Sequence, residues 1–267
     1  MSQHNSYDLY ERYLVPAMFV PAAQELARVA QPQPGERVLD IACGTGIVSR
    51  TLAPLVSVDG AVTGLDITPP MLAVARSIPQ PDGTAPITWV EGSALSLPFE
   101  DHSFEIVTCQ QAIQFFPDRL LALREMRRVL VSGGRAVIGV NQGFENNSAY
   151  SAFNDVLMRH SGIPLLAAPF QFGDTRALGM LFETEGFRDV TVHQVKVSVR
   201  FPNERSFVSA TLFASGAAVA AFQAIDPAVR AAMLDPIHED MRAIFAPYHQ
   251  GDEVIFPLMM NIGRGVA

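Results

Sequence analysis

The sequence predicts an α/β fold: a doubly wound, Rossmann-like and mostly parallel sheet of seven strands, with an α-helical lid. Three observations lead to this prediction. Short runs of apolar residues recur along the chain, helical segments separate them, and a glycine-rich turn follows the first run. Strands that are apolar on both faces lie inside parallel sheets, and strands that alternate with helices form βαβ units. We therefore expect helices on both faces of the sheet.

The first half of the chain supplies most of the predicted sheet. A helix is expected over 17–30, because it stops at the breaker QPQPG. Five strands follow, over 36–43, 62–67, 87–93, 104–110 and 135–141, and the turn SGGR precedes the last of them. Helices are expected after the first, second and fourth of these strands, and the loop LSLPFEDHS follows the third. The helix that starts at Pro69 opens on two prolines, and the one over 117–130 is charged and amphipathic.

The second half is less regular. Helices are expected over 147–160, 174–187, 203–225 and 227–245, and strands over 188–201 and 253–263. The strand over 188–201 alternates apolar and polar residues, and Gly186 before it can end the preceding helix. We expect three parts: an N-terminal helical cap over 1–30, a ligand-binding core over 31–141, and a helical lid with the last two strands over 142–267.

Composition excludes several classes of protein. The 267 residues are 49% hydrophobic and only 17% charged, which argues against disorder. A net charge of −8 without a basic stripe argues against a nucleic-acid partner. Cys43 and Cys109 lie within apolar runs, which suits core residues in a reducing compartment better than a disulfide framework or a metal site. No other ligand spacing suggests a metal.

Targeting signals are weak. The first residues are polar and lack the apolar core of a signal peptide. Residues 206–225 carry no charge, but they are mostly small, which indicates a buried or ligand-facing helix rather than a membrane span. We expect a cytoplasmic protein. No heptad pattern indicates an oligomeric state, so that question stays open.

The stretch VLDIACGTGIVSR, residues 38–50, defines the ligand site. Gly44 and Gly46 allow a tight turn, but the third glycine of a dinucleotide fingerprint and the lysine of a phosphate loop are missing. Asp40 precedes the glycines, where a carboxylate repels pyrophosphate and attracts an ammonium group. Asp66 ends the second strand, where an acid can accept both hydroxyls of a ribose. The pattern fits an adenosine that carries an amino acid and no phosphate, namely S-adenosylmethionine.

Four stretches together resemble a known family. VLDIACGTGIVSR, VTGLDITPPMLAVAR, WVEGSALSLPFEDHSFEIVTCQ and LREMRRVLVSGGR are similar to the class I S-adenosylmethionine-dependent methyltransferases. The closest group contains the ubiquinone/menaquinone biosynthesis C-methyltransferases. The resemblance covers about residues 10–141. In such proteins the N-terminal segment folds over cofactor and substrate, which would involve Tyr7, Tyr10 and Tyr13, spaced three apart. The alternative is that their rings pack while their hydroxyls reach water.

The resemblance implies a set of cofactor-binding residues. Asp40, Ala42, Gly44 and Gly46 would line the methionine part; Asp66 would bind the ribose; Ile67 and Met71 would pack near the adenine, with Ser93, Ala94 and Leu95 at its edge; Gln110, with Gln111 as a second candidate, would flank the methionine near the transfer site. Two residues depart from the family pattern, since Ser93 and Glu105 stand where aspartates are common. We expect a weaker cofactor site, because a neutral hydroxyl is a weaker acceptor than a carboxylate.

The sequence does not identify a catalytic base. Tyr13, His160 and His249 are weak candidates, and methyl transfer needs a base only if the acceptor must lose a proton. The apolar lid favours a small apolar or aromatic acceptor, methylated at O, C or N. Gln110-Gln111-Ala112-Ile113 replaces the Asn-Pro-Pro-Tyr type of motif used on nucleobases. Two alternatives stay open: a non-methylating reaction that uses the same cofactor, and a non-enzymatic cofactor-binding protein.

Overall fold

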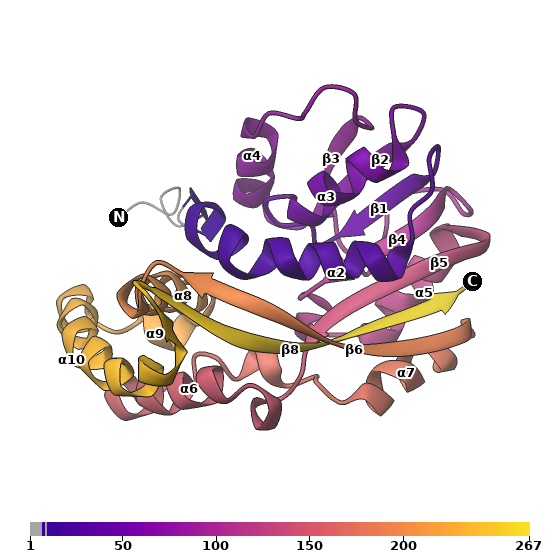
Figure 1. Ribbon diagram of the computed structural model, residues 1–267. Coiled ribbons are helices and arrows are strands. Elements are labelled where there is room, and N and C mark those ends of the chain that lie inside the picture. The colour runs from indigo at the N-terminus through magenta and orange to yellow at the C-terminus, as the bar shows by residue number, and fades with distance from the viewer. Residues whose placement is uncertain (1–6, 9) are drawn as a thin grey trace.

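The computed structural model describes residues 7–8 and 10–267, and it confirms the predicted fold class (Figure 1). One sheet has the strand order β3-β2-β1-β4-β5-β8-β6, with the short β7 (His249–Gln250) paired to β8. The strands are β1 Arg37–Ile41, β2 Ala61–Asp66, β3 Ile87–Glu91, β4 Phe104–Gln110, β5 Leu130–Asn141, β6 Arg188–Phe201 and β8 Glu253–Val266. The first five strands are parallel, and β8 runs antiparallel to β5 and β6.

Helices cover both faces of the sheet. They are α2 Val20–Ala30, α3 Ile47–Val56, α4 Pro69–Ser77, α5 Arg119–Val129 and α7 Thr175–Thr184. Neighbouring residues of β1 show why the sheet needs two covers. Val38 belongs to the hydrophobic cluster that contains residues of α2 and α3, whereas Leu39 belongs to the cluster that contains residues of α5 and α7, and both side chains are fully buried. A strand with two apolar faces is stable only between two layers of helix.

The lid lies at one end of the long β6–β8 pair. Figure 1 shows these strands running from the core toward α6 Ser148–Ser161, α8 Glu204–Ala218, α9 Ala220–Gln223 and α10 Pro227–Phe245. The centre of the lid is aromatic. The Phe207 ring lies 5.0–5.7 Å from the rings of Tyr150, Phe153, Phe201, Phe245 and Phe256. The six rings come from five elements, α6, β6, α8, α10 and β8.

The N-terminal cap has two parts. A π-helix, η1 (Tyr10–Phe19), leads directly into α2, which starts at Val20 with a proline in its first turn. The structure therefore confirms the predicted α-helix over 17–30 from residue 20 onward. The residues before it belong to the π-helix η1. Pro16 lies inside η1 and cannot donate a backbone hydrogen bond, which is compatible with an irregular helix.

Two other details differ from expectation. The helix predicted over 203–225 is divided into α8 and α9, because Val219 adopts an extended backbone conformation between them. The turn predicted before 135–141 is part of β5, which already starts at Leu130 and accommodates Gly133 with a positive φ. Over the described part of the chain, no helix combines the length and apolar character needed to cross a membrane.

Candidate cofactor and acceptor site

The glycine turn joins β1 to α3 with an unusual backbone. Ala42, Gly44 and Gly46 all have a positive φ, a conformation that favours glycine. The two glycines differ in their surroundings. A Cβ on Gly46 would lie 2.2 Å from the ring of Trp89 in β3, whereas a Cβ on Gly44 would meet nothing within 4 Å. Gly46 is therefore required for packing, and Gly44 leaves open space above the turn.

Asp66 connects the end of β2 to this turn. Its Oδ2 accepts a hydrogen bond from the Gly44 amide at 2.7 Å, and its Oδ1 accepts one from the Thr68 amide at 2.8 Å. Each carboxylate oxygen can accept a second bond, so the group retains capacity for ribose hydroxyls. The adjacent Ile67 is 70% exposed, which is unusual for a large apolar side chain. A flat apolar ring such as adenine would cover it.

The loop after β3 lies beside Asp66. The Gly92 amide donates to the Asp66 carbonyl at 3.0 Å, and this bond brings the predicted residues Ser93, Ala94 and Leu95 to the same edge. The Ser93 hydroxyl accepts a bond from the Leu95 amide at 3.2 Å. Met71 is half-buried in the first turn of α4, which follows Ile67. The predicted adenosine-binding residues therefore come from neighbouring strand ends.

Asp40 has a different environment from Asp66. It is only 1% exposed, and it accepts bonds from the Ser49 amide at 3.0 Å, the Ser49 hydroxyl at 2.7 Å and the Thr108 hydroxyl at 3.1 Å. Burial raises the pKa of Asp40 to about 7, despite these hydrogen bonds and with a small contribution from the charge of Asp66. Through these hydrogen bonds Asp40, near the end of β1, connects the glycine turn to α3 and β4. Its predicted contact with an ammonium group stays a prediction, which this burial disfavours.

A chain of amide side chains follows β4. Gln111 Nε2 donates to Asn141 Oδ1 at 2.5 Å, and Gln114 Nε2 donates to Gln111 Oε1 at 3.3 Å. Asn141 in turn donates to the Pro169 carbonyl at 3.5 Å. Gln110, also at the end of β4, donates to the Phe19 carbonyl at 3.4 Å. Sequence reasoning missed Gln114 and Asn141, although a polar residue that ends the apolar strand β5 was a usable signal.

The N-terminal cap contacts the glycine turn. Arg50 of α3 donates to the Thr45 carbonyl and also pairs with Glu11 Oε1 of η1, at 2.7 Å. Burial, and to a lesser extent the charges of Glu11 and Asp66, raise the pKa of Tyr10. Glu11 and Arg50 were not predicted as site residues. They are 39 positions apart, and no local pattern connects them.

The three candidate bases are not brought together. Tyr13 is partly exposed, with the Arg12 guanidinium 5.4 Å from its ring centre. His160 Nε2 lies 2.9 Å from Asp240 Oδ2, and this contact joins α6 to α10 within the lid. His249 Nε2 lies 3.7 Å from Glu204 Oε2 of α8. The recorded partners of both histidines thus belong to the lid and not to the glycine turn.

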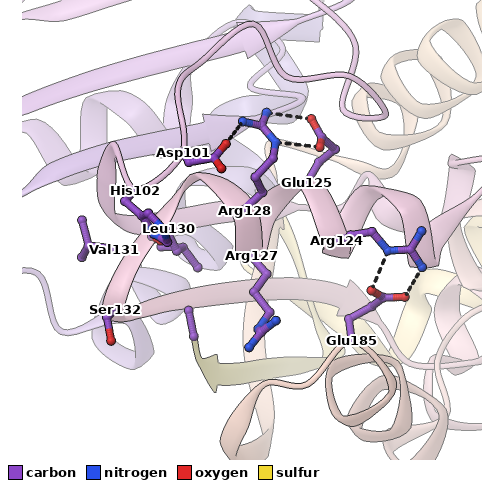
Figure 2. A pocket seen from close by; sticks show the side chains of 11 residues that line it. Asp101, His102, Arg124, Glu125, Arg127, Arg128, Leu130, Val131, Ser132 and Glu185 are labelled. Atoms are coloured by element: carbon purple, nitrogen blue, oxygen red, sulfur yellow. Dashed lines mark hydrogen bonds and ion pairs between the residues drawn. The ribbon is translucent and has the colours of Figure 1, made fainter.

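A separate cavity of about 440 Å³ lies at the opposite edge of the sheet (Figure 2). It is lined mainly by residues that precede β4, by the last turns of α5 and by the start of β5, and so it lies at the amino ends of the parallel strands. Arg128 pairs with Asp101 and Glu125, both at 2.8 Å, and Arg124 pairs with Glu185 at 3.1 Å. These charges neutralise one another. Ligands of doubly wound sheets bind at the carboxyl ends, where the glycine turn lies.

The fold and the geometry of the site indicate which class of ligand the protein binds. The carboxyl ends of the strands hold an open glycine turn, a carboxylate that can accept further hydrogen bonds and an exposed apolar side chain, whereas the described turn lacks the lysine or third glycine of a phosphate site. The donor and acceptor set therefore fits an adenosine ligand without phosphates, as S-adenosylmethionine requires.

Comparisons with known proteins agree with this class. The family model described as a methyltransferase domain matches residues 39–138. Demethylmenaquinone methyltransferases from Bacillus mycoides and Bacillus pumilus are 30% and 33% identical over 184 and 176 residues, which are 63% and 60% of this chain and 77% and 74% of those proteins. The one from Bacillus cytotoxicus is 37% identical over 43% of this chain, but the match spans only 48% of that relative.

Solved structures share the fold. A putative methyltransferase from Bacillus halodurans aligns with a TM-score of 0.60 at 22% identity, over 91% of this chain and 97% of that one. A phosphoethanolamine N-methyltransferase from Haemonchus contortus, in complex with phosphomonomethylethanolamine and S-adenosylhomocysteine, aligns with a TM-score of 0.58 at 17% identity, over 99% of this chain and 57% of that one. The chain belongs to the class I S-adenosylmethionine-dependent methyltransferases.

Proposed function

We propose that the protein transfers the methyl group of S-adenosylmethionine to O, C or N of a small apolar or aromatic acceptor. The observation that carries the proposal is the open turn at Gly44, bracketed by the carboxylate of Asp66 and the exposed side chain of Ile67. The relatives support an aromatic acceptor, because they are named for demethylmenaquinone, a quinone. The neutral amides after β4 suit an uncharged acceptor.

The residues of the chain would act mainly by positioning. When bound, S-adenosylmethionine supplies a methyl group that its sulfonium already activates. Asp66 would hold the ribose, and Ile67, Met71 and the loop that contains Ser93 would hold the adenine. The cap residue Tyr10 and the lid would exclude water from the transfer site. In-line displacement gains most of its rate from such alignment and exclusion, so no base has to be assigned.

We also propose a cytoplasmic protein that acts on a small molecule and not on nucleic acid. Cys43 and Cys109 are free and buried, as is usual in a reducing compartment. The net charge of −8 disfavours binding to a phosphate backbone.

Calorimetric titration with S-adenosylmethionine and with NAD tests the cofactor assignment. The wild type should bind S-adenosylmethionine saturably and NAD not at all. Asp66→Ala should weaken binding about tenfold or more, because hydrogen bonds to a charged group are lost. Asp174→Ala is the matched control, since Asp174 also accepts a bond from a backbone amide, at 2.8 Å, but at the start of α7. Stronger binding of NAD, or binding of neither ligand, would refute the proposal.

Transfer itself needs a second experiment. The purified protein is incubated with methyl-labelled S-adenosylmethionine and a naphthalenediol or simple phenol as the acceptor. Label in the acceptor supports methyl transfer. Conversion of the acceptor without consumption of the cofactor would instead identify a non-methylating reaction on the same fold.

A further inference from the structure

The cofactor's methionine end carries an ammonium group that needs an acceptor in the site. The two acids of the strand ends are already engaged. Asp40 is buried and accepts three hydrogen bonds, and Asp66 accepts from the Gly44 and Thr68 amides at the ribose position. Burial disfavours Asp40 as the partner of the ammonium, and the remaining capacity of Asp66 is assigned to the ribose, which leaves a role for a further acceptor.

Glu11 of the cap has the required free oxygen. Its side chain is only 22% exposed, and its Oε1 pairs with Arg50 at 2.7 Å. Its Oε2 is buried and receives no hydrogen bond from any described residue. A buried carboxylate oxygen without a donor is costly, so this position favours a ligand that brings one.

Two further acceptors without donors lie at the junction of cap and turn. Thr45 is 1% exposed and Gln110 is 9% exposed, and neither Thr45 Oγ1 nor Gln110 Oε1 has a partner in the described structure. Arg50 donates hydrogen bonds both to the backbone carbonyl of Thr45 and to Glu11 Oε1, and so it links the two residues. Gln110 donates to the Phe19 carbonyl, and the Phe19 ring lies 5.2 Å from that of Tyr10, the neighbour of Glu11.

These atoms match one kind of chemical group. A carboxylate oxygen and an amide oxygen can only accept hydrogen bonds, and a hydroxyl can also accept. An ammonium offers three donors and a positive charge, whereas the carboxylate of the same amino acid would be repelled by Glu11. We propose that Glu11 Oε2 binds the α-ammonium of the cofactor's methionine moiety, so that the cap contacts the bound cofactor beside the glycine turn. This inference rests on the proposed function.

The test compares two ligands that differ in the amino acid. S-adenosylhomocysteine carries it, whereas methylthioadenosine keeps the adenosine and the thioether and lacks it. Affinities are measured by calorimetry and by fluorescence of Trp89, the only tryptophan, whose ring lies against Gly46 in the turn. Glu11→Gln should weaken S-adenosylhomocysteine binding about tenfold and leave methylthioadenosine within about twofold, because only the first ligand loses a charge-assisted bond to residue 11.

Arg50→Gln is the matched control. It breaks the same ion pair but leaves both Glu11 oxygens in place, so a loosened cap would weaken both ligands and preserve their affinity ratio. A deamino analogue of S-adenosylhomocysteine gives a second measurement. It should bind wild type about tenfold more weakly than S-adenosylhomocysteine, and the difference should disappear in Glu11→Gln.

The outcomes separate this inference from the proposed function. Equal weakening of both ligands by Glu11→Gln would overturn the inference, and so would no weakening of either. Wild-type protein that binds both ligands with the same affinity would also overturn it while leaving the cofactor assignment intact. Wild-type protein that binds neither ligand would refute the proposed function itself. Thermal unfolding of each variant confirms that it is folded.

Discussion

The glycine turn and the lid are built in opposite ways. The turn gets its shape from backbone conformation and from polar contacts between neighbouring strand ends, as at Gly44, Gly46 and Asp66. The lid gets its shape from aromatic side chains of distant elements that meet around Phe207. A cofactor site can therefore be recognised in a short stretch of sequence, whereas an acceptor pocket under such a lid cannot.

The largest expected effect is a loss of stability when the centre of the lid is truncated, with little change in cofactor affinity. Phe207 is fully buried among five aromatic rings, so Phe207→Ala should lower the free energy of unfolding by about 3–5 kcal/mol. S-adenosylhomocysteine affinity should change less than about threefold, because the glycine turn does not use this residue. Urea denaturation and calorimetry measure the two quantities.

Phe207→Leu is the control for that experiment. It keeps most of the buried volume and should cost less than the alanine variant. If cofactor affinity fell in parallel with stability in both variants, the turn and the lid would be one cooperative unit, and the contrast between them would be wrong.

The two glycines of the turn provide the next test. Gly46→Ala combines a positive φ with a Cβ 2.2 Å from Trp89, and should cost about 3 kcal/mol. Gly44→Ala has the φ penalty alone, about 1 kcal/mol, because its Cβ meets no atom within 4 Å. Gly44→Ala should nevertheless weaken S-adenosylmethionine binding, since its methyl group occupies the open space. Denaturation and titration of both variants measure this.

A double variant isolates the steric part of this effect. Trp89→Phe shortens the ring that a Cβ on Gly46 would meet, so Gly46→Ala/Trp89→Phe should regain part of the lost stability relative to the expected sum. Strictly additive losses would show that the φ of residue 46, rather than contact with Trp89, determines the cost.

The same contrast explains what the sequence could predict. The helix over 227–245 and the strand over 188–201 have the predicted limits, because their periodicity and bounding residues are local. The division between α8 and α9 was missed, since the uncharged run shows no breaker at Val219. The Glu11–Arg50 pair was also missed, because it depends on how the cap lies on α3. Local patterns predict backbone elements, but not side chains that meet through tertiary packing.

The burial of Asp40 predicts a pH-dependent stability. An unfolded aspartate loses its proton near pH 4, whereas burial keeps the pKa of folded Asp40 at about 7. Between these values the folded state binds more protons, so this group makes the protein less stable as pH rises, by at most about 1.4 kcal/mol per pH unit. Below about pH 4 the carboxyl of Asp40 is protonated in both the folded and the unfolded state, so its burial costs no stability. Above about pH 7 it is ionised in both states, and the full cost of burying the charge applies.

Asp40→Asn removes the titration. Its amide can still accept from Ser49 and donate to the Thr108 hydroxyl, so the turn keeps its bonds. Urea denaturation from pH 4.5 to 7.5 should give a flatter profile for Asp40→Asn than for wild type. Asp59→Asn, at an exposed position, serves as control. Parallel profiles for wild type and Asp40→Asn would show that Asp40 is already ionised throughout this range.

The smallest expected effect concerns the lid histidines. His160 is held by Asp240 and His249 lies near Glu204, so neither has a recorded contact with the turn where the methyl group would be held. His160→Ala and His249→Ala should each change kcat less than about threefold, whereas loss of a general base costs about 100-fold or more. Label transfer to a naphthalenediol across pH 6–9 measures this, with Tyr13→Phe assayed in parallel. A 100-fold drop with unchanged S-adenosylhomocysteine affinity would identify that residue as the base. The lid would then supply a catalytic group, and the contrast between a glycine turn that binds the cofactor and a lid that only packs around the acceptor would be wrong.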